Sequence, residues 1–406
     1  MYLCQKQKRI VSKKIITIKN KTIMKKYLFL ALGVAALTSC SSDEVTELNQ
    51  GNEIKFSVVA DNDSRAHDIW CNANKPQDFR VWANSGGNAF MADDEYTFTG
   101  DAYTSTTVRY WPETAGVDFY ALKYTGDVTY ESGNQPKIEA YNPATLVSDQ
   151  QDIIYATKPG ATKTADGVVA LNFRHALSQI EFMAKNNNPT IKVLVKNVCV
   201  GNAVTNGTFT LPAGTTENPY VDATHGTTGA VPATFNQGTW DLTAKTYTDY
   251  SVAVQNPSAA LTTTASSLTL STGANITSAT DHGVVTDDQS MMLIPCSGDA
   301  TTAWDPTDGN LDAGSYLGID VVISNIVTVD GDTYETEIYS GWAYVPAVFA
   351  WEQGKRYVYT FNFGAGKDGG FRADGTPVLT DINLNITVDD FIWAGDTQKE
   401  MDTEVY

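Results

Sequence analysis

The chain has 406 residues, of which 42% are hydrophobic and 18% charged, and its formal net charge at pH 7 is −19. Such acidity argues against nucleic acids and anionic membrane surfaces as partners, because like charges repel. The length is sufficient for two ordinary domains, each with its own core.

The first 39 residues have the features of an export signal. Lys25 and Lys26 precede an apolar run, 27–37, which is too short to span a bilayer as a permanent helix. Residues 1–23 contain seven Lys or Arg and no acidic residue, and we interpret them as an extension from a misassigned start codon. Removal of residues 1–39 takes away nine of the 28 basic residues and no acidic one, which leaves a net charge of −28.

A cysteine follows the apolar run directly. Leu37-Thr38-Ser39-Cys40 has the form of a bacterial lipobox, in which the cysteine is acylated and the signal is cut just before it. Each buried methylene of an acyl chain contributes about 0.8 kcal/mol, so several chains hold a soluble domain on a membrane. The alternative is a plain secretory signal with a coincidental cysteine. We predict lipidation at Cys40, with residues 40–52 as a lipidated linker.

The remainder predicts an all-β fold. Short alternating runs are separated by turns rich in Gly, Asn and Asp, and stretches with a period of 3.6 residues are absent. Pro159, Gly160 and Gly167 interrupt the pattern, which suggests an N-terminal domain at 53–165 and a C-terminal domain at 166–406.

The first expected strand carries Ile54, Phe56 and Val58 on one face and polar residues on the other. A polar run, 61–66, follows it. Proteolytic cleavage concentrates in exposed polar loops, and Arg65 would suit a trypsin-like protease. From this run alone, an ordinary solvated loop residue is the better interpretation of Arg65.

Later strands follow the same alternation. They are expected at 79–83, 108–111, 117–124, 152–157, 168–183, 191–200, 205–211, 247–254, 267–271, 291–295, 315–326, 334–344, 357–363 and 382–388, with a long loop at 125–149. Strands 191–200 and 205–211 should pair through a turn at Gly201-Asn202. The alternation changes phase within 168–183, which indicates a bulge or a crossing between sheets. The stripe of Tyr357, Tyr359, Phe361 and Phe363 indicates core packing, with a sugar-stacking platform as the alternative.

Motifs of catalysis are missing from the sequence. It has no nucleophile elbow, P-loop or dinucleotide fingerprint, and its four histidines are scattered; His175 lies in an apolar phase, as a core histidine would. We expect no enzymatic activity, cofactor or metal, although the acidic loop 305–312 leaves calcium binding as a hypothesis. Cys71, Cys199 and Cys296 allow either one disulfide and a free thiol or three buried, unpaired thiols.

Several sequence blocks stand out along the mature chain. They are the lipobox, Ser64-Arg65-Ala66, Arg109-Tyr110-Trp111-Pro112, Asp152-Ile153-Ile154-Tyr155-Ala156, Phe173-Arg174-His175-Ala176-Leu177-Ser178-Gln179-Ile180, Met292-Leu293-Ile294-Pro295 and Trp351-Glu352-Gln353-Gly354-Lys355-Arg356-Tyr357. Together they resemble the fimbrillin-like (Mfa-like, type V pilin) family of Bacteroidales surface lipoproteins, over nearly all of the mature chain.

This resemblance implies two tandem transthyretin-like Greek-key β-sandwich domains and a fimbrial subunit at the outer membrane that functions in adhesion. It also implies cleavage between Arg65 and Ala66, displacement of the first strand with Ile54, Phe56 and Val58, and donor-strand exchange with other pilin subunits. The acidic residues after Cys40 are then either an export signal to the outer leaflet or an ordinary tether.

The donor strand is less defined by the resemblance. The segment with Ile382, Leu384, Ile386 and Val388 in one phase is either a donor or the closing strand of the second domain, and the polar end, 395–406, suits a tip or accessory subunit. The alternative function is a surface glycan-binding lipoprotein that does not polymerise. For either function, a receptor or glycan on a host or bacterial surface is a further expected partner.

Overall fold

The protein is described by a computed structural model that covers residues 52–59, 76–100, 102–113, 115–165, 167–216, 236–272, 274, 290–364, 370–378 and 382–390. Within these ranges the regular structure is all-β. The only helices there are three short 3-10 turns, η1 (Val147–Asp149), η2 (Pro306–Asp308) and η3 (Leu311–Ala313). None of the described helices is long and apolar enough to cross a bilayer.

The first sheet has eight strands in the order β8-β1-β4-β3-β2-β5-β7-β9. Their bounds are β1 Lys55–Val59, β2 Asp78–Ser85, β3 Asn88–Phe98, β4 Tyr103–Thr104, β5 Val117–Lys123, β7 Ile154–Ala161, β8 Val168–Asn172 and β9 Arg174–His175. Strands β8 and β9 stand at opposite ends of this order although only Phe173 separates them, and β7 also contacts β8. The sheet therefore curls until its two ends meet around one apolar cluster.

Strands β2 and β5 each face two cores. Val81 and Phe119 lie in the cluster inside the first sheet, whereas Trp82, Tyr120 and Leu122 lie in a second, larger cluster. That cluster also contains a three-stranded sheet, in the order β13 (Thr239–Asp241), β12 (Gly207–Thr210), β6 (Lys137–Tyr141). Elements from both sides of residue 165 thus share a core. The division into domains at 165 stays a prediction.

Two further sheets enclose the rest of the second cluster. One has the order β15 (Ser266–Ser267), β10 (Ser178–Asn186), β19 (Lys355–Phe363), β20 (Ile382–Asp390), with β16 (Met291–Leu293) also paired to β10. The other has the order β14 (Thr246–Ala253), β11 (Ile191–Thr205), β17 (Tyr316–Val329), β18 (Asp332–Pro346). Phe182 and Phe361 of the first and Val321 and Ile323 of the second belong to one cluster. Apolar residues alternate along these strands because only one face is covered.

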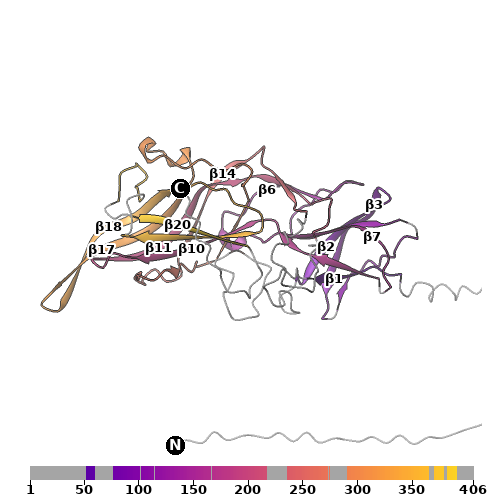
Figure 1. The fold of residues 1–406 in the computed structure, drawn as a ribbon, viewed down its shortest axis with the longest axis horizontal. Coiled ribbons are helices and arrows are strands. Elements are labelled where there is room, and N and C mark those ends of the chain that lie inside the picture. The colour runs from indigo at the N-terminus through magenta and orange to yellow at the C-terminus, as the bar shows by residue number, and fades with distance from the viewer. Residues whose placement is uncertain are drawn as a thin grey trace, which may run out of the picture. The chain divides into compact units, whose positions relative to one another are not determined.

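The β17–β18 hairpin continues past its neighbour (Figure 1). Pairing of β11 with β17 ends at Asn325, while β17 and β18 stay in register to the turn at Asp330-Gly331, where both φ angles are positive. Val327, Val329 and Tyr334 are exposed on this extension.

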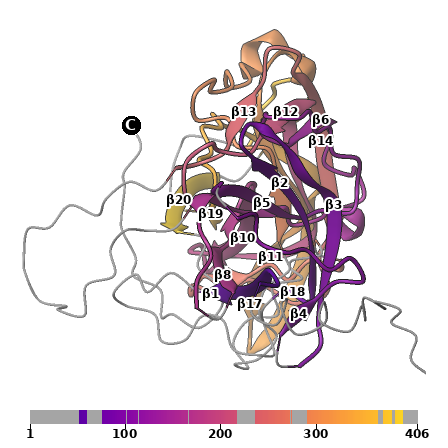
Figure 2. The ribbon, with the colours of Figure 1, turned by 90° about the vertical axis from the view of Figure 1, so that its right-hand side faces the viewer.

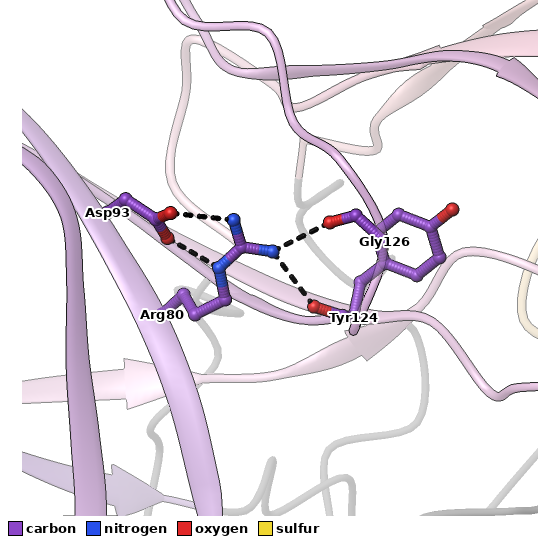
Figure 3. A network of polar contacts seen from close by, with 4 residues as sticks. All are labelled: Arg80, Asp93, Tyr124 and Gly126. Atoms are coloured by element: carbon purple, nitrogen blue, oxygen red, sulfur yellow. Dashed lines mark hydrogen bonds and ion pairs between the residues drawn. The ribbon is translucent and has the colours of Figure 1, made fainter.

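Arg80 of β2 connects Asp93 of β3 with the loop that follows β5 (Figure 3). Its guanidinium contacts both carboxylate oxygens of Asp93, with 2.8 Å between Nη2 and Oδ2, and donates to the carbonyls of Tyr124 at 3.1 Å and Gly126 at 2.8 Å. It also lies 4.9 Å from the centroid of the Trp82 ring. These contacts fix the start of the loop between β5 and β6.

Most expected strands are confirmed, and four expectations are wrong. Residues 108–111 form only one bridge, Tyr110 to Glu53, and β6 lies inside the expected loop 125–149. β11 runs straight through Gly201-Asn202 with a bulge, because Asn202 adopts a positive φ, and β12 pairs with β6 and β13 instead of β11. The phase change within 168–183 is a crossing between sheets, as β9 and β10 lie in different ones.

Candidate functional site

The backbone of β1 is bonded on both sides (Figure 2). On one side it runs parallel to β8, in register from Lys55 opposite Val168 to Val59 opposite Asn172. On the other side it is antiparallel to β4 and to residues 109–111. The flanking bonds run from Ile54 N to Arg109 O at 2.8 Å, from Trp111 N to Asn52 O at 2.8 Å and from Lys55 N to Gly167 O at 3.0 Å. We call β1 with β8, β4 and residues 109–111 the β1 site.

The apolar side chains of residues 54–58, from Ile54 just before β1 to Val58 within it, fill the first core. Ile54 is 2% and Phe56 3% exposed, and the half-buried Val58 packs against the same cluster. The Phe56 ring meets three others edge-on: Tyr96 at 4.7 Å, Phe119 at 5.3 Å and Phe79 at 6.1 Å between centroids. The expected alternation of the first strand is therefore confirmed.

Gly167 allows the close approach of the chain just before β1. Its φ is +72°, and a Cβ there would lie 2.4 Å from the carbonyl oxygen of Glu53. An L side chain is strained at such a φ, and no atom tolerates so short a contact. Glycine is thus the residue that lets β1 enter alongside β8.

An ion pair supports the other wall of the β1 site. Arg109 donates from Nε and Nη2 to the Asp94 carboxylate at 2.6 and 2.9 Å, and Asp94 is 7% exposed. This hydrogen bonding raises the pKa of the Arg109 guanidinium. Burial raises the pKa of the neighbouring Tyr96 hydroxyl, so the phenol stays neutral within this apolar surrounding.

Removal of β1 would leave a surface that only another strand can complete. Full burial of a side chain such as Ile54 or Phe56 stabilises the fold by about 1.5–3 kcal/mol. The backbone groups of β8 and residues 109–111 would also lose their partners, and an unsatisfied buried group costs about 1–3 kcal/mol. The arrangement can accept a strand with apolar residues at alternate positions.

The first two groups of expected site residues come from the N-terminal part of the chain. Cys40, Arg65 and Ala66 lie outside the described residues, as does Cys71. Ile54, Phe56 and Val58 come together in the β1 site.

The C-terminal candidate strand forms β20. Its residues 382–390, which include Leu384, Ile386 and Val388, pair antiparallel with β19, and Ile382 is fully buried. Among the described strands β20 is the outer one of its sheet, with β19 as its single neighbour. In this chain the segment closes its own sheet; donation to another subunit stays a prediction.

The remaining candidates belong to the interior or to turns. His175 is 4% exposed with Nδ1 2.9 Å from Asp152 Oδ1, which confirms the core interpretation, and the four aromatics of β19 are likewise buried. Cys199 and Cys296 are buried free thiols. Asp305 accepts hydrogen bonds from Thr307, and the described residues contain no group of three His, Cys, Asp or Glu that could hold a metal.

The comparisons with known proteins agree with the family resemblance. The family model described as fimbrillin-like matches residues 60–393. No curated protein shows significant similarity to the chain.

Two solved structures illustrate the likeness. A fimbrial protein from Bacteroides vulgatus is 14% identical, with 84% of this chain and 99% of that chain covered, at a TM-score of 0.47. The tip fimbrial protein Mfa3 from Porphyromonas gingivalis, with a C-terminal truncation, is 10% identical, with 83% and 99% covered, at a TM-score of 0.34.

The chain belongs to the fimbrillin-like family. This family consists of fimbrial structural and adhesion proteins and is not a class of enzymes. Membership implies a location in a fimbrium at the cell surface and association with other pilin subunits.

Sequence reasoning found the inward residues of β1 but missed its neighbours. The parallel partner β8 lies more than a hundred residues from β1 in the sequence, and no local pattern predicts such a pairing. In the sequence Gly167 stands out only as an interruption near a boundary, although a glycine directly before an apolar run can mark a close backbone approach.

Proposed function

We propose that this chain is a fimbrial subunit lipoprotein that assembles by protease-triggered donor-strand exchange. It is lipidated at Cys40, surface-exposed on the outer membrane, and cut between Arg65 and Ala66. β1 then leaves, and a strand from another subunit takes its place.

The observation that supports this proposal is that β1 is a short strand that one cut after it would separate from the rest of the domain. Its bonds go to β8, β4 and residues 109–111, while the following segment, 60–75, links it to β2 and contains Arg65. While this link is intact, β1 is held at a high effective concentration beside its binding site, so a competing strand cannot displace it. Cleavage ends the covalent link to the domain, and the same contacts become available to a competitor.

The incoming strand must match the β1 site. It needs apolar side chains two residues apart, in the positions of Ile54, Phe56 and Val58, and free backbone groups on both edges. The segment 382–388 has this alternation. The polar and acidic residues 395–406 suit a tip or accessory subunit, with a shaft subunit as the alternative.

The test is limited digestion of the folded chain from residue 41 onward with an Arg-specific protease. The new N-terminus is read by sequencing and the assembly state by size-exclusion chromatography with light scattering. The matched control is Arg65→Lys, which keeps the charge but removes the cleavage site for such a protease.

Cleavage at Ala66 followed by a ladder of multimers is the result expected for a subunit that both donates and accepts. For a tip or accessory subunit, we expect cleavage without self-multimers but uptake of an added peptide of sequence 382–390. Resistance of Arg65 to cleavage, or multimers that form equally from the Arg65→Lys chain, would contradict the proposal.

A further inference from the structure

The outer face of the β14-β11-β17-β18 sheet carries an aromatic pair at some distance in sequence from the β1 site. Trp342 and Tyr344 alternate along β18 with Ala343 and Val345, which belong to the main core, so both lie on the other face of the sheet. There they pack against a small buried cluster of Cys199, Trp304 and Tyr316. Both are half-buried. Their rings are nearly parallel, with an interplanar angle of 9° and 6.1 Å between centroids.

The neighbouring residues hold these two rings in place. Gly318 of β17 lies beneath Trp342: a Cβ at this glycine would be 3.2 Å from Cε3 and Cζ3 of the indole. Tyr344 is packed edge-on against Trp304 at 6.3 Å and Tyr316 at 5.2 Å between centroids. A ring held in this way loses little conformational entropy when a ligand covers it.

Polar groups lie beside the rings on the same face. Asp320 is the direct cross-strand partner of Trp342, and the Asn197 amide donates to Asp320 Oδ2 at 2.7 Å. Asp320 is half-buried, so its carboxylate is partly open to solvent. Lys196 precedes Asn197 on β11, and its Nζ lies 3.5 Å from Ser340 Oγ of β18.

We propose that Trp342, Tyr344, Asp320 and Asn197 form a binding site for a pyranose unit of an uncharged glycan. We call these four residues the Trp342 platform. A pyranose presents a flat face of C–H groups, which packs on an aromatic ring, and a rim of hydroxyl groups, which donate to a carboxylate and exchange hydrogen bonds with an amide.

Other ligand classes fit this surface less well. A purely apolar ligand would remove water from Asp320 and Asn197 without replacing their hydrogen bonds, which is costly. An anionic ligand would meet one carboxylate at the site and a mature chain whose net charge is −28. A neutral ligand rich in hydroxyl groups satisfies both the rings and the polar atoms.

This proposal is independent of strand exchange, because the platform lies on β11, β17 and β18, which belong to a different sheet from β1. The experiment therefore uses the uncleaved, non-acylated chain. The probes are cellohexaose, maltohexaose, mannohexaose and chitohexaose, with sialyllactose as the charged comparison, titrated at millimolar concentrations by isothermal calorimetry and indole fluorescence.

We expect at least one neutral hexasaccharide to bind and to change the indole fluorescence. Trp342→Ala should weaken binding at least about tenfold, which corresponds to about 1.4 kcal/mol. Asp320→Asn keeps the shape of the side chain and should weaken binding without changing the melting temperature. Trp342→Phe keeps a ring and should retain part of the affinity. The control is Tyr334→Ala, which removes an exposed aromatic from the hairpin extension and should leave binding unchanged.

Three results would overturn the proposal. They are the lack of binding by all four neutral probes, binding that survives Trp342→Ala with unchanged affinity, and a preference for sialyllactose. If Trp342→Ala fails to fold, the Asp320→Asn and Trp342→Phe variants decide the matter, since both preserve the packing around Gly318.

Discussion

Replacement of Phe56 by Ala tests how much β1 contributes to the fold. Phe56 is 3% exposed and meets three aromatic rings edge-on, so the change removes a buried ring and leaves a cavity inside the first sheet. Buried Phe→Ala changes destabilise by about 3–5 kcal/mol. That is a large share of the roughly 5–15 kcal/mol by which native domains are stable.

The assay is equilibrium unfolding of the non-acylated chain in urea, followed by tyrosine and tryptophan fluorescence. The control variant is Tyr334→Ala, in which an aromatic side chain with 58% exposure is lost. We expect a change within about 0.5 kcal/mol for the control. A loss below about 1 kcal/mol for Phe56→Ala would refute the reasoning, because the β1 site would then tolerate the loss of its central side chain.

Three further predictions concern the glycine beside β1 and the buried thiols. Gly167→Ala should destabilise the chain by more than Gly331→Ala, because both positions have positive φ but only Gly167 has a backbone oxygen within 4 Å of the new Cβ. Thermal unfolding of both variants measures the difference. Equal losses of stability would exclude the contact with the Glu53 carbonyl as a cause. The second prediction uses a Cys71→Ser chain that begins at residue 41. Its Cys199 and Cys296 should resist a thiol reagent at pH 8 until urea unfolds the protein, since burial raises both thiol pKa values. Rapid reaction of the folded chain would contradict this. The third concerns pH. Burial raises the pKa of Cys296 from 9.0 to about 11, so between these values the folded chain keeps a proton that the unfolded chain releases. Stability should therefore fall as pH rises through this window, and less steeply in Cys296→Ala; an identical slope would remove the thiol as a cause.

Local alternation was enough to predict the class of fold and the inward residues of β1. Ile54, Phe56 and Val58 share one face of an extended segment, and burial of one face of a sheet requires that pattern. The same logic located β19 and β20, where the alternation is regular.

The sequence alone does not predict which distant strands pair with each other. The parallel partnership of β1 with β8 and the pairing of β6 with β12 join segments distant in the chain, and their sequences have no feature that selects one partner over another. Strand 191–205 was expected to break at Gly201-Asn202 because this dipeptide favours a turn. The structure instead absorbs Asn202 in a bulge, where its amide reaches the carbonyls of Leu311 and Gly314.

The Trp342 platform shows a similar limit. Trp342 and Tyr344 share a face because they are two residues apart, and this much is visible in the sequence. That Asp320 and Asn197 stand beside them depends on the register of three strands, which only the structure provides.

The most direct test of the account is to lock β1 in place and ask whether assembly stops. Ser57 of β1 and Ala170 of β8 are register partners, and both are half-buried on the face opposite Phe56 and Val169. In a Cys71→Ser background, Ser57→Cys with Ala170→Cys would allow a disulfide between the two strands.

After cleavage by an Arg-specific protease, strand exchange predicts that the oxidised protein neither forms multimers nor takes up an added 382–390 peptide. Reduction of the disulfide should restore one or both. Multimers or peptide uptake that proceed equally well while β1 remains covalently bound to β8 would contradict displacement of β1 as the step that permits assembly.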